Sequence, residues 1–128
     1  MKVEEIMLPP ITISPDISII EAIKKMSEKG FGSLIIVDNL KKLIGIITER
    51  DLINFVAKSE NLNSPVSKIM TKKVICISPK DSISDAAEIM SENKIKRLPV
   101  VEKGKVIGVI TVATLLENKD YLDEPFLF

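Results

Sequence analysis

An internal repeat constrains the fold of this chain more than any other feature. Residues 3–53 align with residues 66–116 after only two one-residue adjustments. Both adjustments fall where loops are expected, and loops tolerate changes in length. A repeat of this length indicates two copies of one supersecondary unit. Two similar halves usually pack about a pseudo-two-fold axis, so a cleft between them is a natural ligand site.

Both copies carry the same short motifs in the same order. Each begins with Val-x-x-Ile-Met, has Ser-Pro ahead of its first helix, and closes its last strand with Gly-x-x-Thr. These motifs lie at residues 3–7, 14–15 and 45–48 in the first copy, and at residues 66–70, 78–79 and 108–111 in the second.

Hydrophobic periodicity predicts the order strand, helix, strand, strand, helix in each copy, and hence an α/β fold. Apolar runs without alternation indicate strands covered on both faces. Ser18-x-x-Glu21 and Ser82-x-x-Asp85 have the form of a capping box, and Gly30 is expected to end the first helix. The expected elements are residues 11–13, 18–29, 34–37, 43–47 and 49–58 in the first copy, with 98–101, 106–110 and 112–118 in the second.

The length of 128 residues fits one compact domain or two very small ones. Each half alone has a size at which burial is marginal, so we expect the halves to share a core. The sequence divides into a first repeat at 1–60, a linker at 61–65, a second repeat at 66–118 and a tail at 119–128. The tail holds two of the four Phe residues, and it packs either on its own domain or on a partner.

Composition argues against several classes of function. With 18 basic and 18 acidic residues the formal net charge is zero, so nucleic-acid binding is not expected. No apolar run reaches the roughly 20 residues of a membrane helix. The sequence has no His, the commonest general base and metal ligand, and it shows no activated nucleophile or metal-ligand cluster. We therefore expect no enzyme activity, no required cofactor and no membrane association.

A single cysteine, Cys76, excludes an internal disulfide. Together with the lack of a signal peptide, this favours a reduced, cytoplasmic protein. Because Cys76 lies between Ile75 and Ile77 in an expected strand, we predict that it is buried. The five Met residues fall mostly on apolar faces and are predicted to contact the core or a dimer partner.

Residues 45–51 form the most informative local motif. They place the Thr48 hydroxyl and the Asp51 carboxylate three residues apart, where a strand enters a helix. A carboxylate there can accept both vicinal hydroxyls of a ribose, and N–H groups at the helix start can meet a phosphate. The alternative is a structural capping box with Thr48 as N-cap, and on this segment alone we favour it. The second copy has Thr114 in place of Asp51.

Taken in order and repeated, these motifs resemble a tandem pair of CBS domains, the family named after cystathionine β-synthase. Such a pair is also called a Bateman module. The resemblance covers residues 1–118 and includes the Leu-Pro-Val-Val segment at 98–101. It implies two βαββα units related by a pseudo-two-fold axis, with sheets packed inward and helices outside. It also implies an adenosine-containing ligand: AMP, ADP, ATP, S-adenosylmethionine or sometimes NAD.

In this family the two repeats share each ligand site, so the resemblance assigns two sites. The main site would take the Thr and the acid from the first repeat and an adenine pocket from the second. Its expected residues are Ile46, Thr48, Arg50, Asp51, Lys73, Val74, Ile75, Ile95, Lys96, Arg97 and Pro99. The second site is expected at Pro10, Ile11, Phe31, Gly32, Ser33, Val109, Thr111 and Thr114.

The sequence departs from the family pattern at two positions, and both fall on the second site. Thr114 replaces the ribose-binding acid, and Ile35 stands where the first repeat would carry proline. Nucleotide binding is therefore expected at the main site. There Arg50, Lys96 and Arg97 form a predicted phosphate clamp. Without the resemblance, Lys96 and Arg97 would be assigned to a solvated turn.

The resemblance implies a stand-alone regulatory module that senses an adenosyl ligand and alters the behaviour of a partner protein. It also implies a homodimer formed through helices, with the apolar positions of residues 19–26 and 83–90 as the predicted contact. The alternative is a structural or dimerisation module whose ligand site is vestigial. A thermal-stability shift with one of the adenosyl ligands would favour the sensor.

Overall fold

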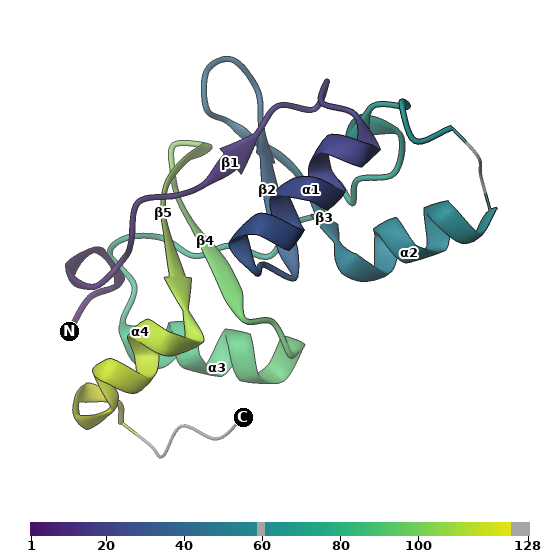
Figure 1. The fold of residues 1–128 in the computed structure, drawn as a ribbon. Helices are drawn as coiled ribbons and strands as arrows, with labels where there is room; N and C mark the ends of the chain where they lie inside the picture. Colours follow the sequence, from purple (N-terminus) through teal and green to yellow (C-terminus); the bar gives the residue numbers. More distant parts are fainter. Residues whose placement is uncertain (59–60, 124–128) are drawn as a thin grey trace. The chain divides into compact units, whose positions relative to one another are not determined.

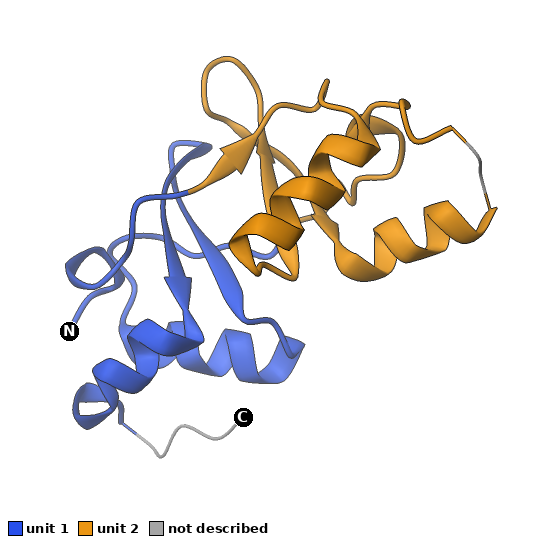
Figure 2. Ribbon diagram, in the orientation of Figure 1, with its two compact units in different colours: residues 1–10, 75–128 blue, residues 11–74 orange. Residues whose placement is uncertain are grey.

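The computed structural model describes residues 1–58 and 61–123, which divide into two compact units (Figure 2). Unit 2, drawn in orange, is the continuous segment 11–74. Unit 1, drawn in blue, combines residues 1–10 with the chain from residue 75 onward. Each unit therefore contains the helices of one repeat together with the lead-in segment of the other.

Unit 2 is a three-stranded sheet with two helices (Figure 1). Its elements are β1 (Thr12–Ile13), α1 (Ile19–Lys29), β2 (Ser33–Val37), β3 (Leu43–Thr48), α2 (Glu49–Lys58) and the 3₁₀ helix η2 (Val66–Lys68). The central strand β2 pairs parallel with β1 and antiparallel with β3. All residues of β2 after Ser33 are buried, as expected for an apolar run covered on both faces.

Unit 1 repeats this arrangement with a smaller sheet (Figure 1). Its elements are the 3₁₀ helix η1 (Val3–Glu5), α3 (Ile83–Asn93), β4 (Arg97–Glu102), β5 (Lys105–Thr111), α4 (Val112–Glu117) and the 3₁₀ helix η3 (Lys119–Tyr121). The antiparallel pair β4–β5 forms the whole of its named sheet. None of the helices in the two described ranges combines the length and apolar character needed to cross a bilayer.

Serine side chains fix the starts of α1 and α3, as predicted. Ser18 Oγ accepts a hydrogen bond from the Glu21 N–H at 3.2 Å, and Ser82 Oγ accepts one from the Asp85 N–H at 3.0 Å. These bonds satisfy N–H groups that have no partner within the first turn of a helix. Gly30 ends α1 in a left-handed conformation with φ 70°, which glycine adopts without steric cost.

The first strand expected in the second repeat is reduced to one parallel bridge between Ile77 and Val100. In unit 2 the corresponding ladder has two pairs, and one of them joins Thr12 to Ile35. The position equivalent to Ile35 is Pro99, and proline has no N–H to donate to a neighbouring strand. The ladder in unit 1 therefore ends one pair earlier.

Cys76 is equivalent to Thr12, so it would form the pair with Pro99 that unit 1 lacks. The prediction that Cys76 is buried is wrong. The residue is exposed and lies outside the named strands. The prediction assumed that Cys76 would be covered as part of a strand. Because the ladder is limited to the bridge at Ile77, no strand pairing covers Cys76.

The lead-in segment of each repeat pairs with the last strand of the other repeat. In unit 1, Leu8 and Val109 exchange two backbone hydrogen bonds, with N···O distances of 2.9 and 3.0 Å. In unit 2, Thr71 and Ile46 exchange two such bonds, both at 2.9 Å. Each unit thus pairs the last strand of one repeat with a short segment of the other repeat.

The glycine of each Gly-x-x-Thr motif makes room for the methionine of the exchanged lead-in. A Cβ placed on Gly45 would lie 2.6 Å from Met70 Sδ, and one placed on Gly108 would lie 2.6 Å from Met7 Sδ. Real Cβ contacts are essentially never this short. The motif glycine and the lead-in methionine are therefore the two sides of one packing contact.

The buried side chains form two cores, contrary to the expectation of one shared core. Each core nevertheless contains residues of both repeats, because Val3 is fully buried in unit 1 and Val66 in unit 2. Met26 and Met90 are buried, as their apolar positions predicted. The exchange of lead-in segments thus allows each half to complete a core of its own.

Most apolar residues of the helix surface predicted to contact a dimer partner lie inside their own unit, and the contact itself stays a prediction. The buried ones are Ile19, Ala22 and Met26 on α1, and Ile83, Ala86, Ala87 and Met90 on α3. Apolar side chains are instead exposed on the second helix of each unit. Ile53 and Val56 on α2 are 67% and 49% exposed, and Leu116 on α4 is 51% exposed.

Candidate ligand site

The strand-to-helix corner of unit 2 holds Thr48 and Asp51 as a reciprocal pair. The Thr48 N–H donates to Asp51 Oδ2 at 2.9 Å, and the Asp51 N–H donates to Thr48 Oγ1 at 3.2 Å. The sequence alternative of a capping box is therefore confirmed. The Glu49 N–H donates to the Gly32 carbonyl at 3.0 Å, which ties the start of α2 to the beginning of β2.

The capping box leaves part of the Asp51 carboxylate available to a ligand. The box uses Oδ2, and no hydrogen bond within the described ranges involves Oδ1. Asp51 is also partly exposed. A carboxylate fixed through one oxygen presents the other in a defined direction, where it can accept a hydrogen bond from a sugar hydroxyl. The structural and the ribose-binding roles of Asp51 are therefore compatible.

The equivalent corner of unit 1 is closed on itself. Thr114 Oγ1 accepts from the Thr111 N–H at 3.0 Å and donates to the Thr111 carbonyl at 2.8 Å. The Thr114 N–H donates to Thr111 Oγ1 at 3.2 Å. Thr114 is only 6% exposed. Its hydroxyl is committed to the backbone, so this corner offers no carboxylate and no available hydroxyl at the position of Asp51.

Unit 1 carries two of the predicted basic residues near its Thr111–Thr114 corner. Arg97 lies across the β4–β5 hairpin from Thr111, and the Lys96 carbonyl accepts from the Val112 N–H at 3.2 Å. Lys96 is exposed, whereas Arg97 is half-buried. Burial lowers the pKa of the Arg97 guanidinium, because desolvation disfavours its charged form. A partly desolvated cation gains more from a bound anion than a fully hydrated one does.

Both predicted sites draw residues from the two units. For the main site, unit 2 holds Ile46, Thr48, Arg50, Asp51, Lys73 and Val74, and unit 1 holds Ile75, Ile95, Lys96, Arg97 and Pro99. For the second site, unit 2 holds Ile11, Phe31, Gly32 and Ser33, and unit 1 holds Pro10, Val109, Thr111 and Thr114. The bridge between Ile46 and Thr71 brings the segment leading to Lys73 beside β3 within unit 2. That the parts held by different units act together stays a prediction.

Ser33 is a neighbour of the Asp51 corner that the sequence assigned only to the second site. The register of the β2–β3 hairpin places Ser33 directly opposite Thr48. This adds a hydroxyl-bearing residue beside the capping box. Hairpin length alone would have placed Ser33 opposite Ile47, because the register shifts by one residue between Ile36 and Val37.

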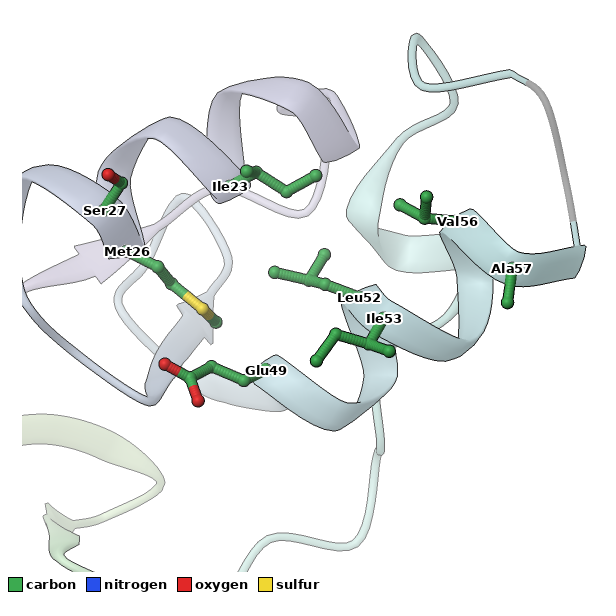
Figure 3. Close-up of a pocket in the computed structure, with 8 residues that line it drawn as sticks. All are labelled: Ile23, Met26, Ser27, Glu49, Leu52, Ile53, Val56 and Ala57. Atoms are coloured by element: carbon green, nitrogen blue, oxygen red, sulfur yellow. The ribbon is translucent and has the colours of Figure 1, made fainter.

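A separate apolar groove lies between α1 and α2 of unit 2 (Figure 3). Its volume is about 560 Å³, and its lining residues are Ile23, Met26, Ser27, Glu49, Leu52, Ile53, Val56 and Ala57. None of the residues predicted to bind the ligand lines it. Only Ser27 and Glu49 bring polar side chains, so the groove does not suit a nucleotide. No cluster of acidic, Cys or His residues fit for a metal ion occurs in the described part of the chain.

Two comparisons identify relatives of the sequence. The family model described as CBS domain matches twice, at residues 3–58 and 66–120. The chain is 38% identical over 117 residues to inosine-5'-monophosphate dehydrogenase of Aquifex aeolicus, which covers 90% of this chain but 24% of that enzyme. Across the curated relatives compared, this chain spans from 21% to 63% of their length.

Solved structures show the same fold. The CBS domain pair of protein MJ0100, in complex with 5'-methylthioadenosine and S-adenosyl-L-methionine, has a TM-score of 0.78 and 32% identity over 94% of this chain and 96% of that one. CBSX2 in complex with AMP has a TM-score of 0.80 and 26% identity over 92% and 95% of the two chains. The paired motifs, the paired units and the two family matches together show that the chain belongs to the CBS domain family and carries two copies of that domain.

Proposed function

We propose that this chain is a regulatory module that binds an adenosyl ligand, of the AMP, ADP, ATP or S-adenosylmethionine type, and thereby modulates a partner protein. The observation that carries the proposal is the Asp51 carboxylate, which Thr48 holds through Oδ2 while Oδ1 remains available. The ligands of MJ0100 and CBSX2 all contain adenosine, which supports the same ligand class here. No catalytic step belongs to the proposal.

In the proposed complex the ribose binds Asp51 and Thr48. The adenine packs on apolar residues of the predicted main site, such as Ile46, Val74 and Ile95. Where the ligand has a phosphate, the basic residues Arg50, Lys96 and Arg97 donate charge-assisted hydrogen bonds to it. Arg97 is the central residue of this clamp, because its partial burial makes an anionic partner favourable.

The alternative function is a structural or dimerisation module with a vestigial ligand site. The closed Thr111–Thr114 corner favours it for the second site. A thermal-stability screen separates the two functions, because a ligand at about 100 times its dissociation constant stabilises a protein by about 2.7 kcal/mol. No shift with AMP, ADP, ATP, S-adenosylmethionine or NAD would favour the structural function.

We expect one dominant nucleotide site per chain. Asp51 offers an available carboxylate oxygen, whereas the Thr114 hydroxyl is buried and committed to the backbone. Calorimetric titration with the adenosyl ligands should therefore give a stoichiometry near one per chain for the ligand that binds. Two equal sites per chain, or a crystal with nucleotide beside Thr114 alone, would contradict the proposed asymmetry.

Arg97→Ala is expected to weaken AMP binding by roughly tenfold or more while leaving adenosine binding nearly unchanged, because hydrogen bonds to charged groups contribute about 1.5–3 kcal/mol. It should also flatten the dependence of AMP affinity on ionic strength. Calorimetry with both ligands at two salt concentrations measures this. Lys24→Ala, which removes the same charge from an exposed position on α1, is the matched control. Equal losses for AMP and adenosine would show that Arg97 shapes the pocket instead of contacting phosphate.

We also propose that the chain forms a homodimer. The apolar side chains of Ile53, Val56 and Leu116 are about half exposed or more. Ile53 and Val56 lie three residues apart on α2 and line the apolar groove beside α1, and a contiguous exposed apolar surface of this kind marks an interaction site. Light scattering that gives a particle of 14.2 kDa at all micromolar concentrations would overturn the homodimer.

A further inference from the structure

We propose that ligand binding at the main site locks the lead-in of the second repeat onto β3, so that the regulated event is the attachment and release of this segment. This regulation rests on the proposed function, because it acts through the same site. The segment, which we call the second lead-in, comprises residues 66–74 and belongs entirely to unit 2. Its contacts with β3 therefore lie within one unit.

The second lead-in is firmly held at its beginning. Val66 is fully buried in the core of unit 2, and its N–H donates to the Ile17 carbonyl at 2.9 Å. The Ser67 N–H donates to the Pro15 carbonyl at 3.1 Å. This end of the segment is part of the core, so it stays in place as long as unit 2 is folded.

A short attachment holds the other end of the second lead-in to β3. Thr71 and Ile46 form an isolated bridge with two backbone hydrogen bonds at 2.9 Å, and Met70 packs on Gly45. Within the described part of the chain, residues 72–76 make no backbone–backbone hydrogen bond. Regions with few buried contacts and few hydrogen bonds open locally at low free-energy cost. The bridge is therefore the place where the second lead-in can separate from β3.

The predicted ligand contacts lie on both sides of this bridge. Thr48 and Asp51 belong to the corner between β3 and α2. Lys73 and Val74 follow the bridge on the second lead-in, and Ile46 is itself a bridge residue. A ligand that contacts both parts loses contacts when the second lead-in separates from β3. Such a ligand shifts the equilibrium toward the attached state by a factor of 1 + [L]/Kd.

The equivalent attachment in unit 1 lacks this linkage to a ligand. Leu8 and Val109 form the same kind of bridge, and Met7 packs on Gly108. The corner that follows Val109 is the closed Thr111–Thr114 pair, which presents no carboxylate. The bridges of the two units therefore share their backbone chemistry but differ in the group that they offer to a ligand. The bridge of unit 1 is an internal control for the bridge of unit 2.

Amide hydrogen exchange, measured by NMR on the full chain, tests the inference. AMP is the probe, with ATP and S-adenosylmethionine as alternatives if AMP does not bind. At about 100 times the dissociation constant, the ligand is expected to slow exchange of the Ile46 and Thr71 N–H groups by roughly 100-fold. It is expected to slow exchange of the Leu8 and Val109 N–H groups by less than about tenfold. Equal slowing at the two bridges would show that the ligand stabilises the whole chain without a local lock, and would overturn the inference.

Met70→Ala and Met7→Ala are a matched pair of variants that loosen one bridge at a time. Each removes the side chain that packs on the motif glycine. Without ligand, each variant is expected to speed exchange at the bridge of its own unit by roughly tenfold. A saturating ligand should restore slow exchange in Met70→Ala but not in Met7→Ala. Restoration in both variants, or in neither, would overturn the inference, and the wild-type measurement stands on its own if a variant fails to fold.

Calorimetry on the same samples separates failure of the inference from failure of the proposed function. If one of the three probes binds but exchange of the Thr71 N–H does not slow, the lock is absent while the adenosyl-binding function stands. If none of the three probes binds, the proposed function fails, and the inference fails with it.

Discussion

A fragment of residues 11–74 is expected to fold by itself, whereas a fragment of residues 1–60 is not. The first fragment is unit 2, including the lead-in of the second repeat. The second is the first repeat as the sequence divides it. The two fragments have similar lengths, so chain size alone does not distinguish them. The comparison therefore tests whether the exchanged lead-in is part of the folding unit.

Fragment 1–60 lacks several groups on which unit 2 depends. Val66 is fully buried in the core of unit 2. Thr71 supplies both hydrogen bonds to the backbone of Ile46 at 2.9 Å. The Ser64 carbonyl accepts from the Ile19 N–H at 2.9 Å, where α1 begins. The loss of a core side chain destabilises a fold, and so does the loss of partners for buried backbone groups. A unit of this size has little stability to lose.

Urea unfolding, monitored by circular dichroism, measures the difference in stability between the two fragments. Fragment 11–74 should show a cooperative transition, and fragment 1–60 should show none. In the full chain, Val66→Ala should lower the free energy of unfolding by about 1.5–3 kcal/mol, the range for a fully buried Val side chain. Val56→Ala makes the same substitution at a half-exposed position and should change it by about 0.5 kcal/mol or less. Cooperative unfolding of fragment 1–60 would contradict the expectation.

The element order could be read from the sequence, but the exchange of lead-in segments could not. Residues 3–7 and 66–70 have the same pattern, so either could in principle pack on Gly45 or on Gly108. Hydrophobic pattern and turn signals depend on neighbouring residues, whereas the choice between these two pairings depends on contacts between distant segments. The structure places Met70 on Gly45 and Met7 on Gly108.

The end of α3 shows a second limit of sequence reasoning. Gly30 predicted the end of α1, because glycine readily takes a left-handed conformation. The same conformation occurs at the end of α3, where Lys94 has φ 53°. Lysine carries no such signal in the sequence. Lys94 is the position equivalent to Gly30 in the repeat, so the second copy keeps the left-handed helix end although the local preference of lysine is against it.

The residue types of the candidate site could be predicted, but not how their atoms are used. Two roles for Asp51 competed in the sequence, and the geometry accommodates both, because only one carboxylate oxygen serves the capping box. The sequence did not reveal that Ile53 and Val56 of α2 are exposed, because their neighbours Leu52 and Phe55 are apolar as well. Such a wide apolar face does not reveal which side packs inward until the helix is placed on its sheet.

Asp51→Ala is expected to weaken binding of the adenine nucleotide by about 1.5–3 kcal/mol, which is the range for hydrogen bonds to a charged group. The reason is the loss of Oδ1, the oxygen proposed to accept a ribose hydroxyl. Calorimetric titration of the purified variant measures the loss. The same substitution also removes the acceptor of the Thr48 N–H, so it should destabilise the start of α2 by about 0.5–2 kcal/mol.

Two further variants separate the binding effect from the effect on the helix. Asp85 lies three residues after Ser82, the N-cap of α3, as Asp51 lies three residues after Thr48. Asp85→Ala removes this acidic side chain and should leave nucleotide affinity unchanged. Asp51→Asn retains an oxygen that can accept from the Thr48 N–H, so it should recover most of the lost stability. Its remaining side-chain group is an amide donor in place of an anionic acceptor, so nucleotide affinity should stay low.

The combination of low affinity and recovered stability in Asp51→Asn is the result that assigns a ligand role to this carboxylate. If affinity returned together with stability, Asp51 would act only by holding the start of α2 in place. If a folded Asp51→Ala chain bound nucleotide as the wild type does, Asp51 would be a capping residue alone. The ligand would then have to be held without the one carboxylate oxygen that distinguishes the corner of unit 2 from the closed Thr111–Thr114 corner of unit 1.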